Sequence, residues 1–442
     1  METKLTRIAE VAKTQPTEKF TSLAHLINKE TIKECHKEMS TKKAAGIDQM
    51  TKEEYELNLE GNVKDLVQRM KRQAYKPQPV RRVYIPKPGT DKKRPLGLPA
   101  YEDKLVQAVL TKILNAIYEQ DFLDCSFGFR PNRGSHDALK ALNVILNKKE
   151  INYVVDADIR AFFDHVDHEW LLKFLQHRIT DPNILRLITR FLKSGIIETD
   201  IYYDTTEGTP QGGVVSPILA NIYLHYVLDI WFEKRIRKQC KGAAYMIRYA
   251  DDSVFCFEYE EEAEQFYSQL TERLKAFNLE VAEEKTKIIC LGKDDEDGDN
   301  TGGGKESKSF DFLGFTHYPY ASGSGITRIR RKTSKKKYRA SLLRCKEWIR
   351  SNRHLPTKDF MEKLNIKLQG YCRYYGVTGN RAAVSDFVDE VKRLIFKWLN
   401  RRSQRKSFDW DKFNLFLRKY PLPKVRTYVN IFELRIGRSY VM

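Results

Sequence analysis

The stretch Met246-Ile-Arg-Tyr-Ala-Asp-Asp-Ser-Val-Phe-Cys-Phe257 has the pattern of two short buried strands joined by a tight turn. Apolar residues flank a pair of adjacent acids, Asp251 and Asp252. Because aspartate is a common turn residue, an ordinary hairpin is one interpretation. Two carboxylates at the tip of a buried hairpin also repel each other, and such a pair favours a bound divalent cation. The metal interpretation requires a third carboxylate on another strand.

A third carboxylate is present in Tyr153-Val-Val-Asp-Ala-Asp-Ile-Arg-Ala-Phe-Phe-Asp164. This segment predicts an apolar strand that ends in acids and continues into a helix. Asp156 and Asp158 alternate with Ala157, so both side chains are expected on one face of the strand. Together with Tyr249-Ala-Asp-Asp252 downstream, the segment resembles the reverse transcriptases of the group II intron type, the intron-encoded maturases.

The resemblance extends from about residue 44 to the C-terminus, which is most of the chain. It implies an α+β fold of the right-hand polymerase type, with fingers, a palm whose antiparallel sheet carries Tyr-Ala-Asp-Asp, and a helical thumb or maturase domain. Further blocks that occur in the family's order are Arg81–Pro99, Cys125–Ser135, Glu207–Pro217, Leu279–Ile289, Ser309–Thr316 and Leu368–Gly376.

Three domains are expected. Residues 1–150 form an N-terminal extension and the fingers, 151–325 the palm, and 326–442 a basic helical thumb or maturase domain. Residues 292–308 are acidic and rich in glycine, which predicts a disordered loop inserted between strands.

The resemblance also implies the catalytic centre. By position relative to Phe162-Phe163, the family's metal-binding aspartate matches Asp158. The three aspartates would act in catalysis, and Lys285 is a candidate general acid for the leaving pyrophosphate, with a solvated lysine as the alternative. Two Mg²⁺ ions, for which Mn²⁺ is a substitute, are expected at Asp158, Ile159, Asp251 and Asp252.

The basic hairpin at Arg81–Pro99 predicts the nucleotide contacts. Pro and Gly mark its turn, and positive side chains around the turn can hold a triphosphate by charge-assisted hydrogen bonds. A solvated basic turn is the alternative. The resemblance implies that Lys87 and Arg94 contact the phosphates of the incoming dNTP, with Lys93 as the alternative to Arg94.

Two further positions complete the expected dNTP site. The resemblance implies that Phe163 lies under the sugar and excludes a ribose 2′-OH; a core phenylalanine is the alternative. Glu207–Pro217 is a glycine-rich loop before a helix that begins near Pro217. In the family, Gln211 of this loop lies beside the nucleotide and the template base.

Five other residues have competing interpretations. Arg130 and Arg133 are template contacts by resemblance, and surface arginines otherwise. The acid Asp164 and the histidines His165 and His168 invite a metal interpretation, but capping and surface positions are favoured because nothing nearby completes a ligand set.

The chain has a formal net charge of +19, and the excess is confined to its last part. Residues 326–442 contain 31 Lys and Arg against 9 Asp and Glu, whereas residues 1–325 contain 47 against 50. A net charge of +22 in the last segment implies a polyanionic partner, most simply nucleic acid. A solubilising surface is the alternative, although such surfaces usually mix both signs.

The seven cysteines are scattered without a C-x-x-C pair, so no zinc finger is visible and a reducing compartment is favoured. The N-terminus has no apolar signal core, and no run of about 18 apolar residues occurs. We therefore expect a cytoplasmic protein without a membrane partner. The resemblance to the intron-encoded reverse transcriptases implies a bacterial source and association with the nucleoid.

The expected function is RNA-directed DNA polymerisation, a nucleotidyltransferase reaction on an RNA template with a DNA or RNA primer and dNTPs. The resemblance implies group II intron RNA as the template and a role in splicing and mobility; a homodimer is left open. The rival is an RNA-binding splicing cofactor with little polymerase activity. A third hypothesis is a host-adopted reverse transcriptase in phage defence or DNA repair. No paired cysteines and histidines follow the thumb, so DNA cleavage is not expected.

Overall fold

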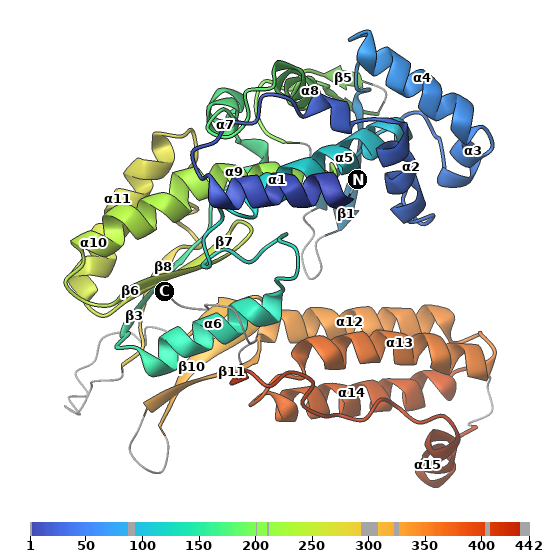
Figure 1. Cartoon of the computed structure of the whole chain (residues 1–442). Coiled ribbons are helices and arrows are strands. Elements are labelled where there is room, and N and C mark those ends of the chain that lie inside the picture. Colours follow the sequence, from blue (N-terminus) through green and yellow to red (C-terminus); the bar gives the residue numbers. More distant parts are fainter. Residues whose placement is uncertain are drawn as a thin grey trace.

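The computed structural model describes residues 2–86, 93–199, 201–209, 212–292, 308–321, 327–402 and 407–433. Within these ranges the chain forms three sheets surrounded by helices (Figure 1). The expected nucleotide contacts Lys87 and Gln211, and nearly all of the loop 292–308, lie outside the described residues.

The central sheet contains both acid-bearing segments. Its strand order is β6-β7-β3-β8, and all neighbouring strands are antiparallel. The predicted hairpin and the predicted apolar strand are therefore confirmed, and they lie side by side. The strands are β6 (Ala244–Tyr249), β7 (Asp252–Phe257), β3 (Tyr153–Ala157) and β8 (Lys287–Cys290).

Both faces of this sheet are covered, which explains why its strands are apolar almost throughout. Val155 and Phe255 pack into a large core with the helices α9 (Ser216–Leu224) and α11 (Glu260–Lys275). Their strand neighbours Val154, Val254 and Cys256 point the other way, into a second core with α6 (Ser135–Lys148). Figure 1 shows α6 between the central sheet and the C-terminal helices.

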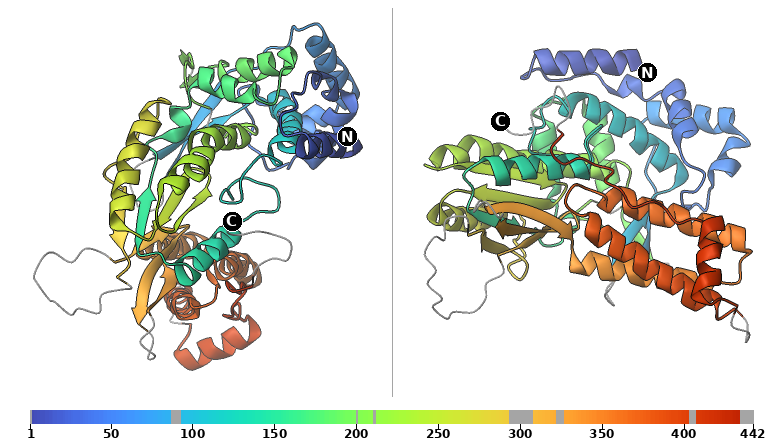
Figure 2. Two further views of the ribbon diagram at one scale, coloured as in Figure 1. Left: turned by 60° about the vertical axis from the view of Figure 1, so that its left-hand side comes forward. Right: turned by 90° about the horizontal axis from the view of Figure 1, so that it is seen from below.

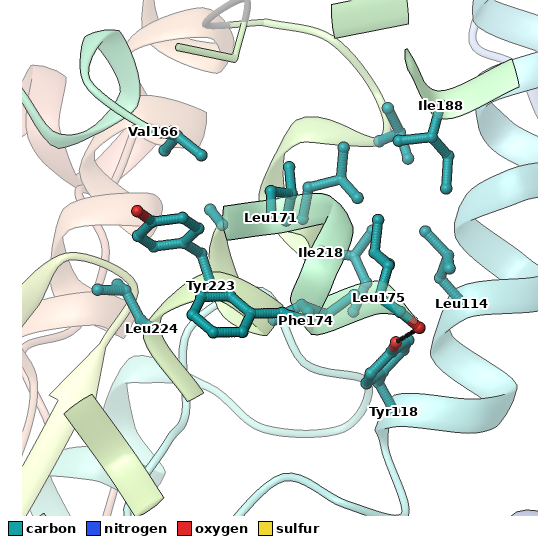
Figure 3. Close-up of a cluster of buried hydrophobic side chains, with 14 of the residues drawn as sticks. Leu114, Tyr118, Val166, Leu171, Phe174, Leu175, Ile188, Ile218, Tyr223 and Leu224 are labelled. Carbon is teal, nitrogen blue, oxygen red and sulfur yellow. Dashed lines mark hydrogen bonds between the residues drawn. The ribbon is translucent and has the colours of Figure 1, made fainter. Parts of the chain in front are cut away.

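The large core continues under the fingers. Figure 3 shows side chains from neighbouring helices meeting there, and the hydroxyl of Tyr118 donates a hydrogen bond of 3.1 Å to the carbonyl of Leu175. This core fixes the fingers to the palm. The helices are α5 (Tyr101–Tyr118), α7 (His168–Leu175), α8 (Pro182–Leu192) and α9.

The fingers contain a second sheet of order β2-β1-β4-β5, flanked by N-terminal helices. The predicted basic hairpin is its β1–β2 pair, with Ile85 opposite Arg94. The strands are β1 (Val80–Pro86), β2 (Lys93–Leu98), β4 (Ile196–Glu198) and β5 (Ile201–Tyr203). The N-terminal helices are α1 (Glu2–Thr14), α2 (Lys29–Glu38), α3 (Lys52–Glu56) and α4 (Leu59–Lys71), with the short 3₁₀ turn η1 (Ala24–Leu26).

The C-terminal part begins with a three-stranded sheet and continues as a helical bundle, whose far end α15 crosses (Figure 2). Leu364, Leu368 and Tyr375 are buried and belong to the core of this part. The elements are β9 (Phe310–Phe312), β10 (Phe315–Ala321), β11 (Thr327–Thr333), α12 (Lys335–Asn352), α13 (Thr357–Tyr375), α14 (Arg381–Leu399) and α15 (Trp410–Lys419).

Among the described residues, no helix is both long enough and apolar enough to cross a membrane.

The side chain of Asn380 joins the bundle to the sheet. It accepts from the Thr333 amide at 2.9 Å and donates to the Thr333 hydroxyl and the Tyr375 carbonyl, both at 2.8 Å. Asn380→Ala leaves these buried groups unsatisfied and should lower the free energy of unfolding by about 2 kcal/mol. Urea unfolding followed by circular dichroism checks this. Asn352→Ala, which removes a single bond within α12, is the control, and an equal loss in both variants would contradict the assignment.

Candidate active site

The two acids of the hairpin are presented by a two-residue turn. Tyr249 pairs with Asp252, so Ala250 and Asp251 form the turn between β6 and β7. Ala250 has a φ of +60° at the first turn position, where turns of the type II′ pattern usually carry glycine. The turn directs Asp251 and Asp252 toward the end of β3.

Asp158 follows directly after β3. The strand ends with Ala157 opposite Ser253 of β7, which brings Asp158 beside the two hairpin acids. The backbone carbonyl of Asp158 accepts from the Ala282 amide at 2.8 Å, and Ile159 bridges to Val281. The structure thus brings Asp158, Asp251 and Asp252 together.

Burial and neighbouring carboxylates raise the pKa of Asp156, Asp251 and Asp252. Burial by surrounding protein, then Asp251 and Asp158, raise the pKa of Asp252 to about 6, although its side chain still reaches solvent. Burial and then Asp158 raise the pKa of Asp251, and the opposing charges of Arg94 and Arg248 lower it. Asp156 belongs to the same group: burial, then Asp252 and Asp158, raise its pKa to about 7. The site therefore concentrates negative charge that the protein does not fully neutralise.

The fingers face this centre. The charge of Arg94 on β2 lowers the pKa of Asp251, so the Arg94 side chain lies near the acids. Phe163 lies in the 3₁₀ turn η2 (Phe162–Asp164), where it is largely buried yet lines a cavity of about 350 Å³ together with Pro95 and Gly97 of β2.

The glycine-rich loop bridges η2 and β2. A Cβ on Gly208, whose φ is +83°, would come within 2.8 Å of the Asp164 carbonyl oxygen. A Cβ on Gly212, whose φ is +113°, would come within 2.4 Å of the Gly97 carbonyl oxygen. Only glycine fits such contacts. The described ends of the loop thus lie against η2 at Gly208 and against β2 at Gly212.

The thumb closes the third side. A cavity of about 920 Å³ separates it from the palm near Asp156 and Asp311. The charge of Lys337 on α12 lowers the pKa of Asp252, so this helix reaches the end of the sheet that carries the acids. Positive side chains from both walls line the cavity: Lys285, Lys287, Lys335, Lys336 and Arg339.

The arrangement of palm acids, fingers hairpin and helical thumb agrees with comparisons between this chain and known proteins. The family model "Reverse transcriptase (RNA-dependent DNA polymerase)" matches residues 85–317, more than half of the chain. The chain belongs to the reverse transcriptase family. A second model, "Group II intron, maturase-specific domain", matches residues 330–416, which identifies the group II intron type.

Two relatives of this reverse transcriptase from bacteria support the assignment. It is similar to group II intron-encoded protein LtrA of Lactococcus lactis, with 46% identity over 38% of this chain and 27% of LtrA. It is also similar to protein YkfC of Escherichia coli, with 32% identity over 56% of this chain and 73% of YkfC. Among solved structures, it resembles Candida albicans telomerase bound to a telomeric RNA fragment, with 12% identity, a TM-score of 0.44, and coverage of 81% of this chain and 65% of that one.

The residues of this reverse transcriptase fit the divalent ions that its family uses. Carboxylate oxygens are the ligands that hard cations prefer, and a bound cation would offset the negative charge that Asp251 and Asp252 share with Asp158. Within the described ranges, no group of three or more His, Cys, Asp or Glu side chains is placed so that it could hold a metal ion by itself. Such ions commonly take their remaining ligands from substrate phosphates and water.

Lys285 occupies the place of a cation on Asp158. Its ammonium nitrogen lies 2.5 Å from Asp158 Oδ2, and this hydrogen bond raises the pKa of Lys285. Lys285 is therefore protonated in this arrangement, as a general acid must be. An ion bound at Asp158 would require the exposed Lys285 side chain to swing away.

The predicted template contact by Arg130 is wrong. Its guanidinium is almost completely buried and donates to both Glu119 oxygens and to the carbonyls of Leu123 and Ser126. Arg133 is also largely buried and pairs with Asp124 at 2.5 Å. Both arginines hold the loop before α6, because buried charges require such partners.

Two residues to which sequence reasoning gave no role in the site support it. The sequence grouped Asp156 with Asp158 only because the two alternate along one strand. Its proximity to Asp311 depends on a hairpin that is distant in the sequence. His168 is neither a cap nor a surface residue: it is buried, and its Nε2 donates to the Gly208 carbonyl at 2.6 Å, which anchors the glycine-rich loop.

Removal of one repelling charge should stabilise the metal-free protein. Because its folded-state pKa of about 6 exceeds the ordinary value of 3.8, Asp252 destabilises the fold increasingly as the pH rises through this window. Asp252→Asn should therefore raise the free energy of unfolding more at pH 8 than at pH 5. Urea unfolding with a chelator at both pH values checks this, with Asp389→Asn on the exposed face of α14 as the control. Equal effects at the two pH values would refute the repulsion.

Proposed function

We propose that this protein is an RNA-directed DNA polymerase that extends a primer 3′-OH on an RNA template with dNTPs and two Mg²⁺ ions. The observation that carries the proposal is the convergence of Asp158, Asp251 and Asp252 opposite Arg94 of the fingers. Carboxylates that share one end of a sheet with a facing cation suit a metal-bound triphosphate.

Each group has a role in this proposal. Asp158 and Asp251, helped by Asp252, would hold the ions, and Ile159 adjoins them. When bound, the ions lower the pKa of the primer 3′-OH and stabilise charge on the leaving pyrophosphate. Arg94, with Lys87, binds the triphosphate. The side chain of Lys285 leaves Asp158 and then protonates the pyrophosphate. Gln211 orients the nucleotide against the template base. Mn²⁺ is the expected substitute ion.

The template–primer duplex would lie between palm and thumb. The basic walls of the 920 Å³ cavity and the net charge of +22 in residues 326–442 support this placement. Such contacts grip the phosphate backbone without needing a particular sequence. The division into domains at 1–150, 151–325 and 326–442 remains part of this proposal.

The maturase-specific match over residues 330–416 favours a second activity. We infer that the basic thumb binds the RNA of a host group II intron, since the relative LtrA is encoded by such an intron. Assistance in splicing and a nucleoid-associated location in the bacterial cytoplasm follow from this inference. Splicing of the intron that flanks the gene, with and without the protein, tests it.

Asp251→Ala should abolish polymerisation while RNA binding is retained. The loss of a metal-binding carboxylate should lower the extension rate by about 1000-fold or more, which is about 4 kcal/mol of transition-state stabilisation. Primer extension on an RNA template with dNTPs and Mg²⁺ measures this, with filter binding of the same RNA and Asp389→Ala as controls. Retained synthesis in a clean Asp251→Ala preparation would refute the site.

Phe163→Ala should relax sugar selection. The smaller side chain leaves room for a 2′-OH, so the preference for dNTPs over ribonucleotides should fall by about tenfold or more. Single-nucleotide incorporation with dGTP and GTP measures the ratio. Phe162→Leu is the matched control, because that neighbouring ring packs in the core against Tyr223. An unchanged ratio in Phe163→Ala would remove Phe163 from the sugar site.

A further inference from the structure

Arg248, the residue before Tyr249-Ala-Asp-Asp252, is an arginine with no exposed surface in the middle of the palm. Its Nε and Nη2 donate to the two oxygens of Asp229 at 2.7 and 2.5 Å. The remaining donors reach Asn221 Oδ1 at 3.0 Å, the Ala250 carbonyl at 2.9 Å and Ser126 Oγ at 2.9 Å. All five N–H groups of the guanidinium are thus used, and its orientation is fixed.

The helical segment that begins at Ser216 departs from α-helical spacing, and this departure lets it supply two of these partners. Asn221 and Asp229 are eight residues apart, whereas residues seven apart share one face of an α-helix. Between them lies a π-helical segment, η3 (His225–Asp229), in which the Ile230 amide bonds to the His225 carbonyl. Its wider i→i+5 spacing accommodates the extra residue, so both side chains reach the same guanidinium.

The network ends on the catalytic turn. Ala250 has a left-handed backbone, which costs a non-glycine residue about 1 kcal/mol or more and persists only when its surroundings hold it. Two contacts hold Ala250 here. Arg248 donates a hydrogen bond to the Ala250 carbonyl, and the backbone of Gly128 packs so closely that a Cβ on Gly128 would come within 2.2 Å of the Ala250 nitrogen. Asn221 also donates to the Gly128 carbonyl at 2.7 Å, which joins the two supports.

We propose that Arg248 is a positioning residue for Asp251, and that Asp229, Asn221 and Ser126 orient it for this task. Its hydrogen bond to the Ala250 carbonyl holds the turn in the conformation that directs Asp251 toward Asp158. Arg248 touches no substrate, so it acts on the placement of the carboxylate. The inference rests on the proposed metal-dependent function of that carboxylate.

Arg248→Lys tests the proposal, because lysine keeps the buried charge beside Asp229 but its single nitrogen cannot serve all four partners. The matched control is Arg178→Lys. Arg178 is equally buried, lies 3.2 Å from Asp121, and donates to the carbonyls of Ala12 and Gln15 in the N-terminal region. Ser126→Ala is a milder second variant if Arg248→Lys does not fold, as judged by circular dichroism.

Two readouts are compared. The first is Mn²⁺ binding by electron paramagnetic resonance, with Asp251→Ala defining the ion bound at the site. The second is the single-turnover rate of dNTP incorporation at saturating dNTP. Arg248→Lys should weaken Mn²⁺ binding about fivefold and slow incorporation about tenfold, with the apparent Kd for dNTP within about threefold of wild type. Ser126→Ala should shift both in the same direction by about threefold, and Arg178→Lys should shift neither by more than about twofold.

Equal behaviour of folded Arg248→Lys and Arg178→Lys would overturn the proposal. Mn²⁺ binding without incorporation in the wild type would refute the polymerase function alone, and the Mn²⁺ comparison would still decide the role of Arg248. A wild type that binds no Mn²⁺ at Asp251 would overturn both.

Discussion

Electrostatic repulsion among carboxylates is the constraint on which the rest of the structure depends. Asp158, Asp251 and Asp252 meet at one end of the central sheet, and Asp156 lies beside them. Such a group would spread apart unless rigid backbone held it and cations approached it. The protein supplies the rigidity through a sheet covered on both faces, and the positive charge through parts of the chain that are distant in sequence.

These positive groups come from all sides. Arg94 approaches from the fingers, Lys337 from the thumb, and Arg248 from beneath the turn. Lys285 forms an ion pair with Asp158 itself. The site thus offers negative carboxylates and positive side chains to a ligand that carries charges of both signs. A triphosphate with divalent ions is such a ligand.

The sequence was sufficient where the signal is local. The β6–β7 hairpin, β3, the β1–β2 hairpin and the helix at Ser216 follow from apolar patterning and turn chemistry, and the family resemblance then pointed to Asp158. The sequence was insufficient where burial decides. Arg130 has the composition of a nucleic-acid contact, and only the fold shows that Glu119 and two carbonyls enclose it. Hydrophobic periodicity does not predict the π-helical segment at His225–Asp229, because the contact that this segment provides to Arg248 is polar.

The most direct test of the central claim is crystallographic. A complex with an RNA template, a dideoxy-terminated primer, the next dNTP and Mn²⁺ should show two anomalous peaks bounded by Asp158 and Asp251, with the triphosphate against Arg94. Lys285 should then have left Asp158 for the phosphates. A nucleotide bound elsewhere, or the absence of Mn²⁺ between these carboxylates in an occupied complex, would contradict the account.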